Sequence, residues 1–262
     1  MESPAARRPP ISAVVITRDA ARLLATVLDA LQWCDEILVV DSGSVDDTVA
    51  IAESRGARVL HRAFDGYGPQ KAFAASAARN DWVFIVDADE VVTDELRAEI
   101  EAKVAAADAG RLAARGFEVP ISLVFLGRVM RGGQYKMPHL RLFDRRHGNY
   151  NAARVHETVV LDAPVARLEH HMLHSSYGSL HQYFEKFNAY TTAGAEELHD
   201  RGGGRTASAA SIVLRFPVTF FKEYVLRANF LNGYAGLVWS LFSAIYPVVK
   251  YAKLRELLES RE

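Results

Sequence analysis

The stretch Trp82-Val83-Phe84-Ile85-Val86-Asp87-Ala88-Asp89-Glu90 joins an apolar run directly to a cluster of carboxylates. The apolar part is aromatic and β-branched, which predicts a strand buried on both faces of a parallel sheet. Side chains alternate along a strand, so Asp87 and Asp89 point to the same side and could share one Mg²⁺ or Mn²⁺ ion. An isolated Asp-x-Asp pair is more often a polar loop that caps the next helix, so the surrounding sequence has to decide.

Strands and helices alternate through the first part of the chain. The hydrophobic spacing predicts strands at 11–17, 36–40, 57–61 and 82–86. It predicts helices at 20–31, at 70–79 and at 93–107, and a further helix that follows the segment 41–48 and ends at Ser54. This alternation implies a doubly wound α/β fold with a mainly parallel sheet. Acids follow three of the strands, at Asp19, at Asp41 and at Asp87 with Asp89. Ligands bind at the carboxyl ends of such strands, so a nucleotide site is expected there.

The usual glycine-rich phosphate loops are absent from the sequence. Neither G-x-G-x-x-G after the first strand nor G-x-x-x-x-G-K-S/T occurs, which disfavours dinucleotide oxidoreductases and P-loop enzymes. A bound diphosphate would then need another source of positive charge. A divalent cation on the paired aspartates would supply it.

Length and composition narrow the function further. The 262 residues allow one large domain with an appendage, or two small domains. A net charge of -1 argues against a dedicated nucleic-acid-binding protein, and the single cysteine, Cys34, excludes an internal disulfide. Met1 to Pro10 contains no apolar run, so we expect no signal peptide and a cytoplasmic protein.

Beyond residue 107 the pattern changes to shorter strands at 116–125, 136–143 and 157–161, which predict a mixed or antiparallel part that could hold an acceptor. Arg141 and Glu157 lie beside apolar strand residues and are the better candidates for a cleft. The run from Arg145 to His147 is more typical of a solvated charged face. The histidines at 170, 171 and 174 lack the spacing of a metal motif.

The C-terminal part is predicted to be helical, with an aromatic helix at 179–198. The segment 228–249 contains no charged residue and is long enough to cross a bilayer, but asparagine, glycine and serine residues dilute it. Because lysines and arginines flank it, we expect helices lying at the cytoplasmic membrane surface. A helical hairpin packed on the domain, or an oligomer interface formed by these helices, is the alternative.

Several motifs in order resemble family-2 glycosyltransferases with the GT-A fold. They are Val15-Ile16-Thr17-Arg18-Asp19, Glu36 through Asp41 with Ser42-Gly43-Ser44-Val45-Asp46-Asp47-Thr48, and Val86-Asp87-Ala88-Asp89-Glu90. The remainder is similar to the subgroup of β-1,4-glucosyltransferases of the lipopolysaccharide inner core. That likeness is carried by Phe64-Asp65-Gly66-Tyr67-Gly68-Pro69-Gln70-Lys71, Arg141-Leu142-Phe143, Val155-His156-Glu157 and Leu173-His174-Ser175-Ser176-Tyr177.

The resemblance implies a GT-A sheet with flanking helices and a C-terminal helical, membrane-associated extension. We divide the chain accordingly into a flexible N-terminus (1–10), a catalytic domain (11–177) and a C-terminal helical region (178–262). Within the catalytic domain, 11–107 would form the nucleotide-sugar half and 108–177 the acceptor half.

The resemblance also implies roles for individual residues. The metal, Mg²⁺ or Mn²⁺, would be bound by Asp89, with Asp87 and His174 as further ligands. The sequence has no Glu-Asp pair followed by Gln-x-x-Arg-Trp, so the catalytic base is expected elsewhere, at Glu157 or, as the second choice, Asp144. The nucleotide-sugar would contact Thr17, Arg18, Asp19, Asp41, Gln70, Lys71, Asp87 and Arg141.

The expected function is therefore inverting, metal-dependent transfer of a hexose, glucose in the first place, from a UDP-sugar. The acceptor would be a glycolipid or lipid-linked saccharide of the lipopolysaccharide core or another envelope glycan, at the inner face of the cytoplasmic membrane. Two alternatives remain open at this point: a sugar nucleotidyltransferase, which would release pyrophosphate, and a non-catalytic, membrane-docked sugar-binding scaffold.

Overall fold

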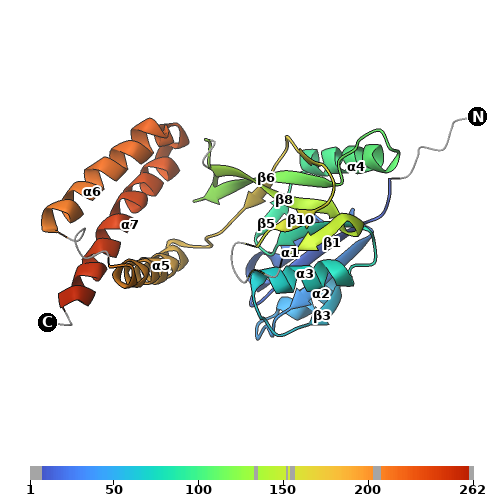
Figure 1. Ribbon diagram of the computed structural model, residues 1–262, viewed down its shortest axis with the longest axis horizontal. Coiled ribbons are helices and arrows are strands. Elements are labelled where there is room, and N and C mark those ends of the chain that lie inside the picture. Colours follow the sequence, from blue (N-terminus) through green and yellow to red (C-terminus); the bar gives the residue numbers. More distant parts are fainter. Residues whose placement is uncertain (1–7, 133–134, 152, 154–156, 203–207, 260–262) are drawn as a thin grey trace, which may run out of the picture. The chain divides into compact units, whose positions relative to one another are not determined.

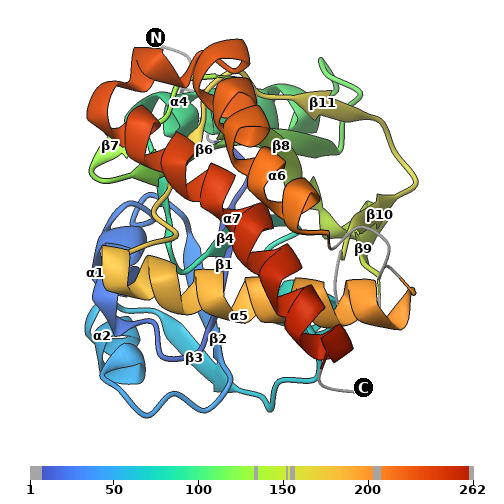
Figure 2. The same cartoon turned by 90° about the vertical axis from the view of Figure 1, so that its left-hand side faces the viewer.

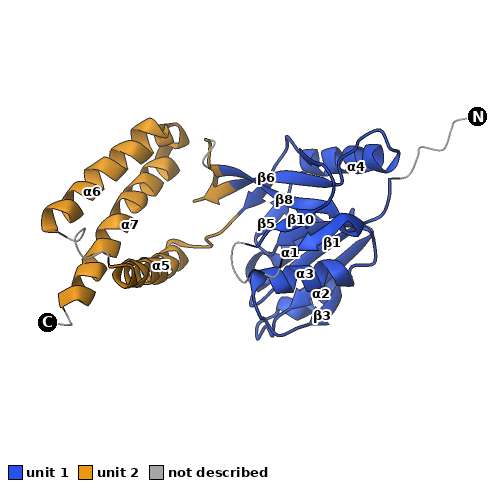
Figure 3. Ribbon diagram, viewed as in Figure 1, with its two compact units in different colours: residues 1–122, 136–174 blue, residues 123–135, 175–262 orange. Residues whose placement is uncertain are grey.

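The computed structural model describes residues 8–132, 135–151, 153, 157–202 and 208–259. The chain divides into two compact units (Figure 3). Unit 1 comprises Met1–Ser122 and Lys136–His174, and unit 2 comprises Leu123–Tyr135 and Ser175–Glu262. This division differs from the predicted boundary at residue 177, because the segment Leu123–Tyr135 belongs to the helical unit.

The first half of unit 1 is a parallel sheet. Strands β1 (Ile11–Thr17), β2 (Glu36–Asp41), β3 (Arg58–His61) and β4 (Trp82–Asp87) run in the order β3-β2-β1-β4, all parallel. The helices α1 (Ala21–Asp29), α2 (Thr48–Ser54) and α3 (Tyr67–Ala77) connect them. The predicted alternation is confirmed. Helix α3 begins three residues before the predicted start, with Pro69 in its first turn, where no backbone N–H is needed.

The second half of unit 1 extends the sheet with antiparallel strands. Strand β8 (Lys136–Asp144) pairs with β4 and with β6 (Gly116–Phe125), and β12 (Met172–His174) pairs with β5 (Glu90–Val92), each time antiparallel. Strand β11 (Val165–Arg167) lies along β6, while β9 (Gly148–Tyr150) and β10 (Val159–Leu161) form a separate hairpin. The mixed character of this half agrees with the prediction.

Helices cover both faces of this sheet (Figure 1). One face packs against α1, α2 and α4 (Asp94–Asp108), and the other against α3 and the β9–β10 hairpin. In β4, Phe84 and Val86 belong to the first core, whereas Val83 and Ile85 belong to the second. The strand is therefore buried on both faces, as its apolar run predicts. It places Asp87 at its carboxyl end.

Unit 2 is built from helices and one short hairpin. It contains α5 (Leu180–Asp200), α6 (Ala209–Phe221), a π-helical turn (Lys222–Leu226), a 3₁₀ turn (Asn229–Asn232) and α7 (Gly233–Glu259). Helix α6 lies beside α7, and α5 crosses α7 (Figure 2). Its core is aromatic: Phe125 at the end of β6 has ring centroids 5.1 Å from Trp239 and 5.8 Å from Tyr183. The hairpin formed by β6 and β7 (Arg128–Val129) joins unit 2 through this cluster.

Glu36, at the start of β2, ties three elements of unit 1 together. Its carboxylate accepts hydrogen bonds from Ser12 Oγ (2.6 Å), from the backbone N–H of Arg79 (2.6 Å) and from Arg58 Nη2 (2.7 Å). Burial alone would raise the pKa of Glu36, but these donors hold it below its ordinary value. The ionised form of Glu36 therefore stabilises the folded state.

We predict that Glu36→Gln lowers the free energy of unfolding by about 2 kcal/mol at neutral pH, because hydrogen bonds to a charged group are lost. Since the folded pKa lies below the unfolded one, this contribution is complete above the unfolded pKa and disappears as the pH falls through the folded value. Urea unfolding of both proteins between about pH 7 and about pH 3 measures this convergence. A difference that stays constant with pH would contradict the role of the charge.

Candidate active site

Asp87, the last residue of β4, lies between two cations. Its Oδ2 is 2.6 Å from Arg141 Nη2, and its Oδ1 is 3.3 Å from Lys71 Nζ. Burial would raise the pKa of Asp87, but the charges of Arg141 and Lys71 hold it well below its usual range. Asp87 is therefore ionised, and both of its oxygens are engaged within the protein. This leaves it poorly suited to the metal-ligand role that the resemblance implied.

Glu90 contacts the same nitrogen of Arg141 as Asp87 does. Its Oε1 is 2.8 Å from Arg141 Nη2, and its Oε2 accepts the backbone N–H of Asp87 at 2.9 Å. Glu90 is almost fully buried, and burial together with the neighbouring Asp87 charge raises its pKa, although Arg141 opposes the rise. The acid that follows the Asp-x-Asp pair thus holds Arg141 and the backbone of Asp87 in place.

A β-bulge directs Arg141 toward these acids. In the pairing of β6 with β8, Phe117 is opposite Leu142 and Glu118 is opposite Leu140, so Arg141 is the extra residue. Bulges of this kind change the direction of a side chain and occur often beside active sites. The pKa of Arg141 is raised well above its ordinary value, because Asp87 and Glu90 outweigh the effect of burial. The guanidinium stays charged at every accessible pH.

Lys71 connects Asp87 to Glu157. It projects from α3 and is buried, and its Nζ is 2.8 Å from Glu157 Oε1. The ring centroid of Tyr150 lies 5.8 Å from the same Nζ. Although burial opposes it, the charge of Asp87 raises the pKa of Lys71. The structure thus places Glu157 close to Asp87, through the Lys71 that contacts both. Val155 and His156, the other two residues of the Val155-His156-Glu157 motif, lie outside the described residues.

Asp89 and His174 form a second, more open pair. Strand β12 pairs with β5 so that His174 is opposite Glu90, and His174 Nε2 is 3.3 Å from Asp89 Oδ2. Both side chains are about one-third exposed, at 35% and 32%. Burial would lower the pKa of His174, but the hydrogen bond and charge of Asp89 raise it.

These two side chains fit a shared divalent ion. Within the described part of the chain, no three His, Cys, Asp or Glu residues are grouped closely enough to hold a metal alone. A carboxylate and an imidazole that remain open to solvent could hold an ion whose other ligands are water and diphosphate oxygens. Mg²⁺ in particular is usually bound in this way, through few protein ligands.

Hydrogen bonds join the loops that follow β1 and β2. Asp41 accepts hydrogen bonds from Thr17 Oγ1 (3.0 Å) and from the backbone N–H groups of Gly43 and Ser44 (2.9 Å each). Burial would raise the pKa of Asp41, but these bonds lower it. Asp19, which adopts a left-handed φ of 49°, accepts the N–H of Val45 at 2.9 Å.

The predicted donor-site residues at these loops therefore divide into two kinds. Thr17 and Asp41 are buried and support the loops, whereas Arg18 and Asp19 are exposed and accessible to a ligand. Gln70 is also buried, and its Nε2 donates to Ser42 Oγ at 3.0 Å, which connects α3 to the loop after β2.

Asp144, the second choice for the base, lies at the opposite end of β4 from Asp87. It is opposite Trp82, at the amino end of β4, whereas Asp87 is at the carboxyl end. It is fully buried, and Arg146 Nη2 lies 2.6 Å from its Oδ2. Burial would raise the pKa of Asp144, but its bonds to Arg146 lower it. Asp144 is therefore poorly placed to act as the base.

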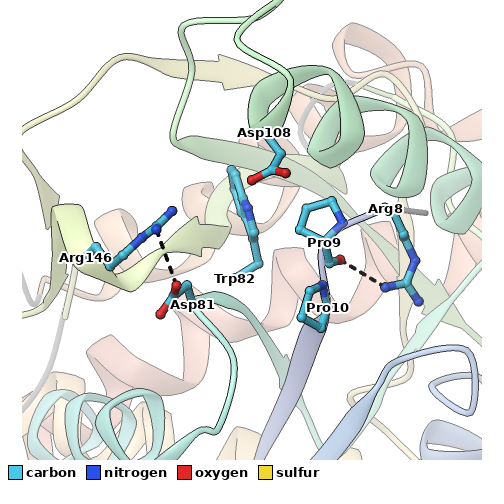
Figure 4. A pocket seen from close by; sticks show the side chains of 7 residues that line it. All are labelled: Arg8, Pro9, Pro10, Asp81, Trp82, Asp108 and Arg146. Carbon is cyan, nitrogen blue, oxygen red and sulfur yellow. Dashed lines mark hydrogen bonds and ion pairs between the residues drawn. The ribbon is translucent and has the colours of Figure 1, made fainter. Parts of the chain in front are cut away.

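A separate cavity lies at the amino end of β4, near Asp144. It measures about 540 Å³ and is lined by Arg8, Pro9, Pro10, Asp81, Trp82, Asp108 and Arg146 (Figure 4). Asp81 and Arg146 are ion-paired there at 3.4 Å. None of the predicted donor-site or metal residues lines this cavity, so it is separate from the candidate active site.

Two residues near the site were not predicted from the sequence. Tyr150 lies beside Lys71, and burial raises the pKa of its hydroxyl although the charges of Arg141 and Lys71 oppose the rise. The pKa of His139 is lowered by burial and by the nearby charge of Arg141. No motif marks either of them. His139 could have been found only from its position two residues before Arg141 on the same strand.

Comparison with known proteins identifies the class to which this site belongs. Residues 12–146 match the model of glycosyl transferase family 2. A protein of Rickettsia felis named "Uncharacterized glycosyltransferase" is 33% identical over 96% of this chain and 92% of its own. The chain is therefore a family-2 glycosyltransferase, and its mixed sheet with flanking helices is a GT-A fold.

A more specific relative is the "Lipopolysaccharide core biosynthesis glycosyltransferase LpsC" of Rhizobium meliloti. It is 27% identical over 96% of this chain and 95% of its own. Among solved structures, that of S. aureus TarS residues 1–349 aligns with 97% of this chain and 92% of its own at 15% identity, with a TM-score of 0.46. The chain is thus a homologue of a lipopolysaccharide core glycosyltransferase. Family membership favours glycosyl transfer over the sugar nucleotidyltransferase alternative.

Gly68, in the first turn of α3, contacts the segment that leads to Glu157. Its N–H donates to the carbonyl oxygen of Ala153 at 3.1 Å. An added Cβ atom would lie 2.3 Å from that oxygen and 2.5 Å from the carbonyl oxygen of Asn151. Only glycine allows this close approach of the two backbones.

We predict that Gly68→Ala displaces this segment and lowers kcat for glycosyl transfer by about 100-fold, as a misplacement near 1 Å commonly does. Steady-state kinetics would measure the loss, and the thermal midpoint would show that the protein remains folded. A normal kcat in a folded Gly68→Ala protein would mean that the contact does not position Glu157.

Proposed function

We propose that the protein is an inverting, metal-dependent hexosyltransferase that moves glucose from a UDP-sugar to a saccharide of the lipopolysaccharide core or a related envelope glycan. The observation that carries the proposal is the convergence of Asp87, Lys71, Arg141 and Glu157 at the carboxyl end of β4. The open pair of Asp89 and His174 is part of the same region. Homology to LpsC supports the choice of acceptor.

The donor would bind across the loops that follow β1, β2 and β4. Arg18 and Asp19 are exposed there and would contact the uracil and ribose, while Thr17 and Asp41 hold the loops in shape. Arg141 and Lys71 carry the positive charge nearest to Asp87 and would hold the diphosphate. Charged donors aimed at a developing anion contribute most in a buried site.

Asp89 and His174 would hold the divalent ion. When bound, such an ion neutralises the negative charge that grows on the departing diphosphate. Asp87 would remain with its two cations and orient them. Asp89 would then be the principal metal ligand.

Glu157 would act as the base. In the proposed step its carboxylate takes the proton of an acceptor hydroxyl, whose oxygen bonds to the anomeric carbon while the bond to the diphosphate breaks. Attack from the face opposite the leaving group converts an α-linked donor to a β-linked product. The 2.8 Å contact of Glu157 with Lys71 would limit the motion of this carboxylate.

For the base, we predict that Glu157→Gln lowers kcat by about 10²- to 10⁴-fold, because an amide cannot accept the proton. UDP binding measured by calorimetry should change little. Asp162→Asn, which removes an exposed carboxylate from the same hairpin, is the matched control and should keep normal turnover. Wild-type kcat in the Glu157→Gln protein would exclude Glu157 as the base.

For the metal site, we predict that Asp89→Ala removes the stimulation of UDP release by Mn²⁺ or Mg²⁺. Asp108→Ala, the same change at the last residue of α4 beside the separate cavity, should leave it intact. The assay follows UDP release from UDP-glucose against metal concentration. If the wild-type protein releases no UDP under any condition, the non-catalytic scaffold becomes the better explanation.

A further inference from the structure

The outer face of α6 is apolar, the reverse of a helix on a soluble domain. None of its residues is buried. Its exposed positions are all apolar, and after Ala209 and Ala210 they recur with helical spacing at Val213, Leu214, Pro217, Val218 and Phe221. In a surface helix of a protein in water, a stripe with this spacing would point to the core. Here it points away from the core of unit 2.

The apolar stripe continues through the turns into the start of α7. Leu226 is 70% exposed and Tyr234 is 73% exposed. We define the apolar face as Val213, Leu214, Val218, Phe221, Val225, Leu226, Phe230, Leu231, Tyr234 and Leu237. Ten large apolar side chains exposed within one continuous segment form the kind of surface that normally binds a partner or a membrane.

The charges in this segment are almost all positive. Between Ala209 and Leu237 the sequence contains Arg215, Lys222 and Arg227 but a single acid, Glu223. That acid is buried, and its Oε1 is 2.7 Å from Arg227 Nη1. The apolar face is thus accompanied by cations alone at its surface. This combination matches the acyl chains and anionic headgroups of a bilayer.

An apolar groove adjoins the face. Val213, Phe216, Pro217, Ile245 and Val248 line a space of about 530 Å³ between α6 and α7. Val213 belongs both to the groove and to the apolar face, so the two surfaces are continuous. The groove adds apolar area that acyl chains could cover.

A second copy of the chain matches this surface less well. In a two-fold interface the same patch meets itself. The cations beside the patch would then approach their own equivalents, and like charges oppose such a contact.

Crossing the membrane is also disfavoured by the packing of α7. By length and composition alone, Asn229–Glu259 could span a bilayer. However, Asn229, Asn232 and Ser240 are fully buried in a hydrogen-bonded network with Tyr135 and Arg131. Helix α7 also packs on α5 through its aromatic residues. A spanning helix would lose both sets of contacts, whereas a helix at the surface keeps them.

We propose that the apolar face of unit 2 docks on the surface of an anionic lipid bilayer. Its aliphatic and aromatic side chains enter the upper acyl region, while Lys222 and Arg227 meet the headgroups. The proposal concerns unit 2 alone and does not depend on the assignment of the donor, metal or base.

The test is flotation of the full-length protein with vesicles of phosphatidylcholine, with and without phosphatidylglycerol. Binding should be much stronger to the anionic vesicles and should decrease with salt. Leu226→Asp should weaken binding at least tenfold, because an exposed apolar anchor becomes an acid. Lys222→Gln should weaken it about fivefold, the contribution expected of one cation near an anionic surface.

Val165→Asp, which changes an exposed valine of unit 1, is the matched control and should bind as the wild type does. Release of UDP from UDP-glucose in solution should be unaffected by Leu226→Asp, which separates loss of docking from loss of catalysis. Equal flotation of the Leu226→Asp and wild-type proteins would overturn the proposal. The proposal would also be overturned if the wild-type protein did not bind vesicles and instead formed a dimer that Leu226→Asp dissociates in sedimentation analysis.

Discussion

The candidate site depends on one buried interaction, the contact of Arg141 with both Asp87 and Glu90. A buried guanidinium is costly unless carboxylates surround it, and a buried carboxylate next to another acid is costly unless a cation lies between them. Removing Arg141 would leave the buried Glu90 without the cation that it contacts. The network therefore holds the carboxyl end of β4, the bulge in β8 and the first residue of β5 in a single arrangement.

This arrangement explains a division among the acids that follow β4. Asp87 and Glu90 are used to position Arg141 and Lys71, so they have little capacity left for another ligand. Asp89 points to the more open side, where its partner is His174. An Asp-x-Asp-Glu sequence can thus provide both an internal framework and a ligand-facing carboxylate, because neighbouring residues around a turn face different surroundings.

The sequence predicted much of the fold, because the parallel strands carry strong local signals. The run from Trp82 to Val86 correctly indicated a central strand buried on both faces. That the acids after it form a donor and metal site stays a prediction. The role of Arg141 could not be derived in detail, because a bulge depends on the register between β6 and β8. The position of Asp144 away from the site could not be predicted for a related reason. Nothing in the local sequence shows that β8 runs antiparallel to β4 and so carries Asp144 to the amino end of β4.

The helical region illustrates the same limit. The uncharged segment 228–249 indicated α7 as the exposed apolar helix, but α7 is partly covered by α5, and most residues of the apolar face lie on α6 and the turns after it. Composition identifies apolar residues, whereas packing decides which of them stay exposed. The segment Leu123–Tyr135 likewise belongs to unit 2, where Phe125 and Tyr135 contact Trp239, and no local sequence pattern shows this.

We propose that the carboxyl ends of β1, β2 and β4 bind a nucleotide-sugar together with a divalent ion. A crystal structure of the protein with UDP and Mn²⁺ tests this binding mode. We expect the nucleotide at the loops after β1 and β2, the ion on Asp89, and the diphosphate near Arg141 and Lys71. Nucleotide bound instead in the cavity beside Trp82, or an ion that does not contact Asp89, would contradict it.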